Sequence, residues 1–212
     1  EDTTVTQEDG REIDLRGLAL IDAHRWLRPR ELAMFLYPAQ LERIKSAERK
    51  LRQWRRDGWI IERILPKRAG RAIVLSEAGA REIGAVTGKD WGDHEIDKVS
   101  GASTWQAPQT WKHDLYQSSL LACLSMLGYE IVWTERAIRR ESAKGRHVPD
   151  AVVRKGDVWW WVEVESERKS GPLQRQMVRA LIKAATETET WVCATCTVNS
   201  AMLVFSTTQR DE

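Results

Sequence analysis

Cysteine is scarce in this chain, and long hydrophobic runs are missing. The 212 residues include only 3 cysteines, too few for a disulfide framework, which indicates a reducing, cytoplasmic compartment. No apolar run approaches the ~18 residues that a membrane-spanning helix needs, so we expect no membrane partner. The chain begins at Glu1 without a methionine and without a basic and then apolar leader, so we expect a trimmed form or a fragment of a longer protein.

Two common kinds of functional site are also missing from the sequence. No glycine-rich loop that could cradle nucleotide phosphates is present, so we expect no use of ATP. Cys193 and Cys196 form a C-x-x-C pair, but a second pair of zinc ligands is lacking. On a strand, the two side chains would face opposite sides, which argues against a zinc site.

The small net charge of +2 hides a segregation of charge along the chain. Residues 1–14 contain six acidic residues and one arginine, whereas residues 25–71 contain fourteen Lys/Arg and five Asp/Glu. This local excess of nine positive charges (14 − 5) favours a polyanionic partner. The alternative is a solvated helical face that binds nothing.

Three helices are predicted at the start of the basic region, over residues 15–27, 29–36 and 39–57. The third has an apolar stripe at helical spacing, formed by Leu41, Ile44, Ala47, Leu51 and Trp54. Four cations share a sector of roughly 60° well away from this stripe. These residues are Lys45, Arg49, Arg52 and Arg56, and we refer to them as the basic ridge.

A basic hairpin follows the helices, with strands at residues 59–65 and 71–75 around a turn at 66–70. Ser76 can cap a last helix at 77–85. This order resembles the winged helix-turn-helix family, including its L-S/T-x-x-G exit at residues 75–79. The resemblance implies that the third helix lies in the major groove of duplex DNA and that the hairpin contacts the backbone or minor groove. The DNA-contacting residues would be the basic ridge and three hairpin cations, Lys67, Arg68 and Arg71. The alternative is a winged helix that contacts only other proteins.

A segment rich in Gly, Ser, Thr and Pro, with little periodicity, separates this module from a second one. We therefore divide the chain into an acidic N-terminal segment (1–14), a winged helix domain (15–86), a linker (87–112) and an α/β domain (113–208). The expected elements of the last domain are a helix from His113 to Gly128, a strand at 129–134, a polar basic stretch at 136–147 and a hairpin at 148–165. A helix at 171–187 and strands at 190–197 and 201–206 complete an α/β sandwich around a small mixed sheet.

Acidic residues stand out on the otherwise apolar strand at 158–165. Glu163 and Glu165 point to the same face because strand side chains alternate, and the hairpin brings Asp150 beside them. Burial of carboxylates costs several kcal/mol unless they are paired, protonated or bound to a metal. Three converging carboxylates form a hard-oxygen site of the kind that Mg²⁺ or Mn²⁺ prefers.

These residues resemble the PD-(D/E)XK nuclease superfamily, whose fold is that of restriction endonucleases. Pro149-Asp150 stands at the first motif, and Glu163-Val164-Glu165 at the second. More narrowly, a winged helix followed by HDL (113–115), PDA (149–151) and VEVExxxK (162–169) is similar to the replication-relaxation family, which includes the type C mobilisation relaxases. One departure is that Glu165 stands where the superfamily usually has lysine, so Lys169 is the nearest replacement.

The resemblance implies a DNA-binding protein that nicks or cleaves DNA with a divalent metal, in plasmid mobilisation or replication, alongside other proteins of those processes. Asp150 and Glu163 would hold Mg²⁺ or Mn²⁺, Glu165 would add a ligand or orient water, and Lys169 would offset charge on the phosphate. The alternative is a non-catalytic repressor or relaxosome accessory factor in which Glu165 and Lys169 form a structural ion pair. Further candidates near the site are His113, Asp114, Glu135 and His147.

Overall fold

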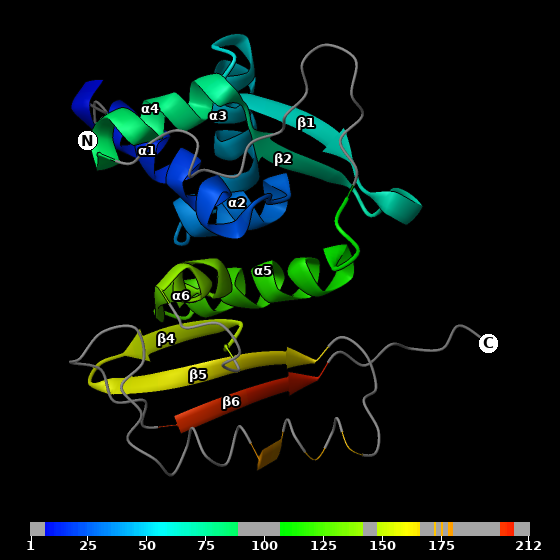
Figure 1. The fold of residues 1–212 in the computed structure, drawn as a ribbon. Coiled ribbons are helices and arrows are strands. Elements are labelled where there is room, and N and C mark those ends of the chain that lie inside the picture. The colour runs from blue at the N-terminus through cyan, green and yellow to red at the C-terminus, as the bar shows by residue number, and fades with distance from the viewer. Residues whose placement is uncertain are drawn as a thin grey trace. The chain divides into compact units, whose positions relative to one another are not determined.

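The computed structural model describes residues 7–88, 107–141, 148–165 and 200–205, together with Pro172, Arg175, Val178 and Arg179. The chain divides into two compact units, Glu1–Gln109 and Thr110–Glu212, and this division falls inside the segment 87–112 that we predict as a linker. Both units combine helices with β-sheet, so the protein belongs to the mixed α/β class (Figure 1). Within the described residues, no helix has the length and apolar character needed to cross a membrane.

Unit 1 contains four α-helices and one antiparallel hairpin within its described residues. The helices are α1 (Gln7–His24), α2 (Pro29–Leu36), α3 (Arg43–Arg56) and α4 (Glu77–Thr87), and the hairpin strands are β1 (Ile60–Ile64) and β2 (Arg71–Leu75). The turn between the strands contains a short 3-10 helix, η1 (Pro66–Arg68). The expected order of three helices, a hairpin and a helix is confirmed. α1 begins at Gln7, however, so residues 7–14 are helical and do not form a separate acidic segment.

The core of unit 1 explains why α1 extends into the acidic stretch. Asp14, one residue before the predicted start of the helix, is only 8% exposed. Its Oδ1 accepts hydrogen bonds from Lys50 Nζ at 2.6 Å and from Trp54 Nε1 at 2.7 Å. Gly17 lies against the Trp54 ring, where a Cβ atom would be 2.1 Å from Cη2. A buried acid therefore joins α1 to α3, because its charge is offset by Lys50 and by the indole N–H.

The apolar stripe predicted for α3 is only partly buried. Ala47, Leu51 and Trp54 are each at most 1% exposed, as expected for the inner face of the helix. Leu41 is 99% exposed and Ile44 is 46% exposed, so these two members of the predicted stripe are not buried with the others. The reason is that α3 begins at Arg43. Leu41 therefore lies in the preceding turn, and Ile44 lies in the first turn of the helix, beyond the core.

The transition from the hairpin to α4 follows the sequence prediction. Ser76 occupies the N-cap position with an extended backbone, and its Oγ accepts a hydrogen bond from the backbone N–H of Gly79 at 3.1 Å. The Ser76 hydroxyl also donates to the carbonyl oxygen of Gly58. One side chain therefore satisfies a free N–H of the helix and ties α4 to the end of α3.

Unit 2 contains a four-stranded mixed sheet in its described part. The helices are α5 (Trp111–Met126) and α6 (Glu135–Glu141), and the strands are β3 (Glu130–Thr134), β4 (Ala151–Lys155), β5 (Val158–Glu165) and β6 (Ser200–Phe205). The strand order is β3-β4-β5-β6, with β5 and β6 parallel and the other pairs antiparallel. α5 packs against β3 and β5 (Figure 1). The expected hairpin of β4 and β5 is confirmed.

One element of unit 2 differs from expectation. Residues 136–147 are predicted as an irregular polar stretch, but α6 occupies its first part. Ile138 is 1% exposed, and Arg139 forms an i,i+4 ion pair with Glu135 at 2.6 Å. One buried apolar side chain and this pair are consistent with a short helix despite its charged sequence. The predicted strand at 190–197 and most of the predicted helix at 171–187 lie outside the described residues.

Candidate nucleic-acid interface and carboxylate site

The four cations of the basic ridge are all exposed on α3. At ~100° per residue, the centre of the ridge lies opposite the centre of the buried residues Ala47, Leu51 and Trp54. Lys45 forms an ion pair with Glu42 at 2.6 Å, but both side chains are at least 70% exposed, so water weakens this pair. Within the described residues, Arg52 and Arg56 form no ion pair. The ridge therefore presents its positive charge directly to solvent.

Arg49 also influences a neighbouring side chain of unit 1. Burial raises the pKa of Tyr37, and the positive charge of Arg49 opposes this effect. Tyr37 follows α2 and is 7% exposed. Arg49 therefore lies near the segment that joins α2 to α3.

Arg71, which we predict as a DNA contact, is engaged within the protein. Its Nη1 lies 3.3 Å from Glu62 Oε2 on β1, and its Nη2 is paired with Glu48 Oε1 on α3. Burial by itself would lower the pKa of Arg71, but the two glutamates raise it. Arg71 thus links β2 to β1 and α3. Its place in this network favours a role in holding the hairpin against the helix rather than a phosphate contact.

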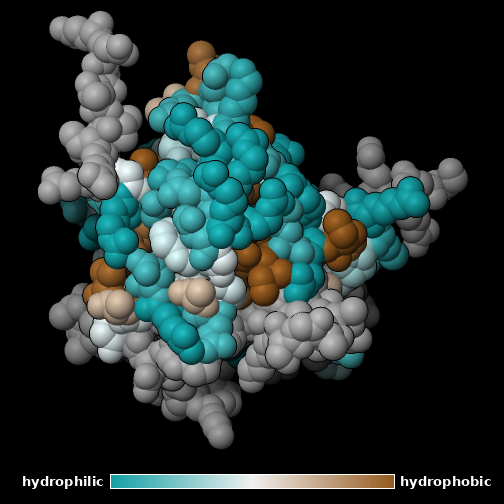
Figure 2. Space-filling model, turned by 90° about the horizontal axis from the view of Figure 1, so that it is seen from above, coloured by the Kyte–Doolittle hydropathy of each residue, from teal (hydrophilic) through white to brown (hydrophobic). Residues whose placement is uncertain are grey.

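The other two hairpin cations lie at the tip of the turn. Lys67 and Arg68 are exposed, and their φ angles are 53° and 57°. This left-handed backbone region is uncommon for residues other than glycine, and such residues are enriched in turns and at functional sites. The described surface visible in Figure 2 is mostly hydrophilic, with only scattered hydrophobic residues. Such a surface suits a charged partner better than an extended apolar one.

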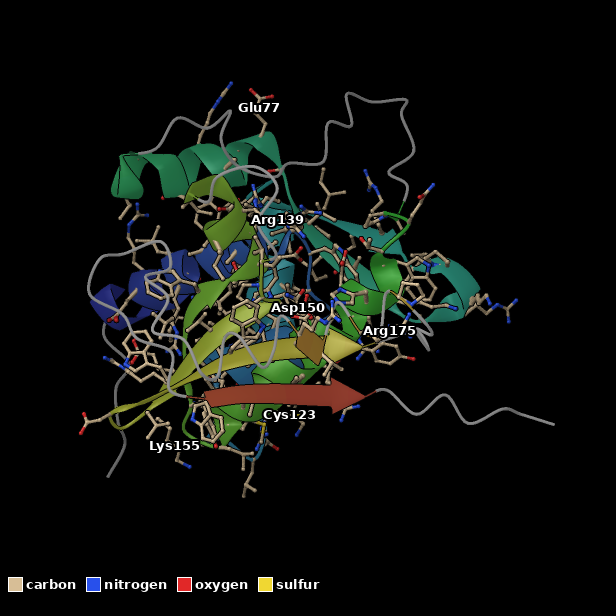
Figure 3. The ribbon with its side chains drawn as sticks, turned by 60° about the horizontal axis from the view of Figure 1, so that its bottom comes forward. Glu77, Cys123, Arg139, Asp150, Lys155 and Arg175 are labelled. Atoms are coloured by element: carbon tan, nitrogen blue, oxygen red, sulfur yellow. The ribbon has the colours of Figure 1, made fainter. Side chains whose placement is uncertain are left out.

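In unit 2, Asp150 is the central residue of the candidate carboxylate site. It is 6% exposed and directly precedes β4. Its Oδ2 accepts a hydrogen bond from the backbone N–H of Val164 at 2.6 Å. Its backbone N–H donates to Val162 O at 3.1 Å, and its carbonyl accepts from the Glu135 N–H at 2.9 Å and from Gln117 Nε2. Figure 3 shows Asp150 beside β5 among other side chains, whereas Lys155 at the hairpin end points outward.

His113 on α5 faces the same carboxylate. Its Nε2 lies 3.3 Å from Asp150 Oδ2 and 3.1 Å from Val164 O, and its Nδ1 lies 3.9 Å from Asp114 Oδ1. Both ring nitrogens therefore face oxygen acceptors. The carboxylates of Asp114 and Asp150 raise the pKa of His113 to about 10, although burial opposes the shift, and Glu135 contributes in the same direction as the aspartates. His113 is therefore an imidazolium at neutral pH and balances the buried charge of Asp150.

Glu163 is a second buried acid at the end of the β4–β5 ladder, whose last pair is Ala151 and Val162. Asp150 precedes this pair, and its bonds to Val162 O and to the Val164 N–H place it beside the part of β5 that carries Glu163. Glu163 is 7% exposed, and its Oε2 accepts a hydrogen bond from Trp161 Nε1 at 3.2 Å. The expected hairpin brings both acids to the same end of the β4–β5 ladder, and their convergence with Glu165 stays a prediction. Gln117 and Trp161 were not among the predicted site residues, although Gln117 follows His113 by one helical turn.

The other predicted members of the site cannot be placed beside these two acids. The side chain of Glu165, and all of His147 and Lys169, lie outside the described residues. Within the described residues, no group of three His, Cys, Asp or Glu side chains could hold a metal ion. Asp150 and Glu163 already accept protein N–H groups, and the imidazolium of His113 repels a second cation. The described side chains as placed therefore do not fit Mg²⁺ or Mn²⁺, and binding of these ions stays a prediction that depends on Glu165.

Comparison with known proteins yields no relative for this chain. No family model, curated protein or solved structure matches it. The resemblances to winged helix proteins, to PD-(D/E)XK nucleases and to the replication-relaxation family therefore rest on the residues of this chain alone.

Proposed function

We propose that unit 1 binds duplex DNA as a winged helix, with α3 in the major groove and the β1–β2 hairpin beside the sugar-phosphate backbone. The observation that carries this proposal is the position of the basic ridge, opposite the buried side of α3. The major groove of B-DNA admits one α-helix, whose outward face then meets phosphates and base edges. A helix whose core-distal face carries four cations is suited to this position.

Two sets of contacts support the proposal by holding α3 in a fixed orientation. The Asp14–Lys50–Trp54 cluster joins α3 to α1, and Arg71 joins the hairpin to α3 through Glu48. Recognition of a groove requires that the helix and the hairpin meet the duplex together. The acids of unit 1 therefore serve the interface indirectly, by fixing the elements that carry its cations.

The experiment is a salt titration of binding to duplex DNA. The slope of log K against log salt should be about −0.9Z for Z neutralised phosphates. Replacement of Arg52 and Arg56 together by alanine should make the slope shallower by up to about 1.8, since two phosphate contacts are lost. A matched control replaces Arg11 and Arg81, which are exposed and paired with glutamates. The control should keep the parent slope, although both variants lose two positive charges.

An unchanged slope in the Arg52/Arg56 variant would rule out α3 as the DNA-binding helix. The alternative reading, a winged helix that contacts only proteins, predicts no salt-dependent binding to DNA by the parent protein. The titration therefore separates the two interpretations.

A second candidate function is metal-dependent nicking or cleavage of DNA in plasmid mobilisation or replication. The burial of both Asp150 and Glu163 near the end of the β4–β5 ladder favours it. The test is nicking of supercoiled plasmid in Mn²⁺ or Mg²⁺, compared between the parent and Lys169→Ala. Loss of a positioned cation should reduce the rate by roughly 10² to 10³, while DNA affinity stays within a few fold.

The rival is a repressor or relaxosome accessory factor that keeps the nuclease-like unit as a scaffold. It predicts no metal-dependent nicking by the parent, and no rise of the melting temperature in millimolar Mn²⁺. A rise in the parent that Glu165→Gln abolishes would instead favour the metal site, by the linkage of binding to stability. The arrangement of His113 and Asp150 favours the scaffold.

A further inference from the structure

The ring of His113 lies between two carboxylates of unit 2. Its Nε2 is 3.3 Å from Asp150 Oδ2, and its Nδ1 is 3.9 Å from Asp114 Oδ1. The side chains of Asp114 and Asp150 are 15% and 8% exposed, so water solvates these acids only in part. Carboxylates in such surroundings need hydrogen-bond donors or a cation. A cation between them must come either from the protein or from a bound ion.

The hydrogen bonds of the ring show that His113 fills this position as a donor. Its Nε2 also lies 3.1 Å from Val164 O. A carbonyl oxygen can only accept, so Nε2 carries a proton. A metal ion binds histidine through a nitrogen that has lost its proton. In this arrangement Nε2 is therefore not a metal ligand, and the ring occupies the space between the two acids.

Neighbouring side chains of α5 hold both acids around the ring. Gln117, one helical turn after His113, is 8% exposed and donates its Nε2 to the carbonyl oxygen of Asp150. On the other side of the ring, Thr110 Oγ1 donates to Asp114 Oδ2 at 3.2 Å. The two carboxylates thus keep their positions through contacts that involve only protein groups.

We propose that His113 occupies the cation position between Asp114 and Asp150 and takes the place of a divalent metal ion there. α5 and the end of the β4–β5 hairpin are then held together without a metal. This role of His113 does not depend on the binding of DNA by unit 1. It involves Asp114, which is not a ligand in the metal site of the second candidate function.

The experiment removes the ring and tests whether Mn²⁺ replaces it. His113→Ala leaves the two carboxylates without their cation, so this variant should bind Mn²⁺ in calorimetry. Its melting temperature should rise by about 5–10 °C at roughly ten times the dissociation constant. Addition of Asp114→Asn to His113→Ala should abolish both effects, because one carboxylate loses its charge. The parent should bind no Mn²⁺ in a way that depends on Asp114.

The matched control is Lys112→Ala, which removes one positive charge from the adjacent, exposed position of α5. Lys112 does not lie between the two acids, so this variant should behave as the parent does in Mn²⁺. An equal gain of Mn²⁺ affinity in Lys112→Ala and His113→Ala would show that only the net charge matters, and the proposed position of His113 would then be wrong.

Imidazole gives a second readout that needs no metal ion. His113→Ala has a cavity of the shape of the lost ring, so millimolar imidazole should raise the melting temperature of this variant and not that of the parent. If the variant alone does not fold, refolding with imidazole or with Mn²⁺ is measured instead.

Two results would overturn the role of His113. One is that neither imidazole nor Mn²⁺ stabilises or refolds His113→Ala. The other is that the parent binds Mn²⁺ and loses this binding in Asp114→Asn. Neither result affects the binding of DNA by unit 1, which the salt titration tests separately.

Discussion

Replacement of Gly17 by alanine should destabilise unit 1 even though alanine is the better helix former. A Cβ atom at this position would lie 2.1 Å from Trp54 Cη2 and 2.8 Å from Cζ2, well inside van der Waals contact. The indole has no free direction in which to move, since Trp54 is fully buried and its Nε1 is bonded to Asp14 at 2.7 Å. α1 and α3 must therefore separate, or the hydrogen bond must break.

The magnitude follows from opposing contributions. Alanine gains about 1 kcal/mol over glycine in a helix interior. Overpacking of a filled core costs about 1–3 kcal/mol, and weakening of a hydrogen bond to a carboxylate costs about 1.5–3 kcal/mol. We expect a net loss of about 2 kcal/mol in the free energy of unfolding. For a unit of this size, the melting temperature should fall by about 10 °C.

The matched control is Gly10→Ala in the same helix. No atom lies within 4 Å of a Cβ atom at Gly10, so the substitution should stabilise unit 1 by about 0.5–1 kcal/mol. Urea denaturation followed by circular dichroism measures both changes. DNA affinity should fall for Gly17→Ala, because α3 carries the basic ridge, and should not change for Gly10→Ala. Equal stability of Gly17→Ala and the parent would refute the close contact between α1 and α3.

Three further predictions concern single side chains. Burial lowers the pKa of His24 to about 4. The stabilisation should therefore be fully present above pH 6.5, and the free energy of unfolding should fall by at most about 3 kcal/mol as the pH drops to 4. His24→Leu should flatten this part of the curve of stability against pH, and an unchanged curve would contradict the lowered pKa of His24. The raised pKa of His113 has the opposite sign, since its stabilisation is complete below pH 6.5 and is lost as the pH rises to about 10. Between pH 7 and 10 the free energy of unfolding should therefore fall by about 1–2 kcal/mol more for the parent than for His113→Asn, after allowance for partial exposure. Melting temperatures measured over this pH range should decline more steeply for the parent. Ser76→Ala should cost about 1 kcal/mol in urea denaturation, from loss of the helix cap, and a neutral result would exclude the cap as a stabilising feature.

Elements marked by turn residues could be predicted closely from the sequence. The strands at residues 71–75 and 158–165 have the expected bounds, because glycine-containing turns and dense β-branched or aromatic residues define them locally. The beginning of α1 could not be predicted in this way. An acidic stretch resembles a solvated tail unless its partners are known, and the partners of Asp14 are 36 and 40 positions away in the sequence.

The candidate site of unit 2 also combines features that are defined locally with features that depend on tertiary packing. The β4–β5 hairpin, which brings Asp150 and Glu163 to the same end of the sheet, is a local feature, so the sequence predicts it. The approach of His113 to Asp150 depends on how α5 crosses the sheet, which is set by packing rather than by any short motif. The short helix α6 depends on the burial of Ile138, a single apolar residue among charged neighbours. The residue that balances the charge of a buried carboxylate is therefore determined by tertiary packing, and it cannot be predicted from the spacing of a motif.

In unit 1, packing determines which cations are paired with acids and which are exposed on the outer face of α3. Lys50 and Arg71 face neighbouring elements, and each is paired with acids that hold those elements together. Arg52 and Arg56 lie opposite the core and form no ion pair within the described residues. Because the acids of this unit neutralise the cations at the sides of α3, the positive excess of residues 25–71 is concentrated on the outer face of the helix. An interface with DNA needs this arrangement, since attraction by phosphates depends on where the charge lies and not only on its sum.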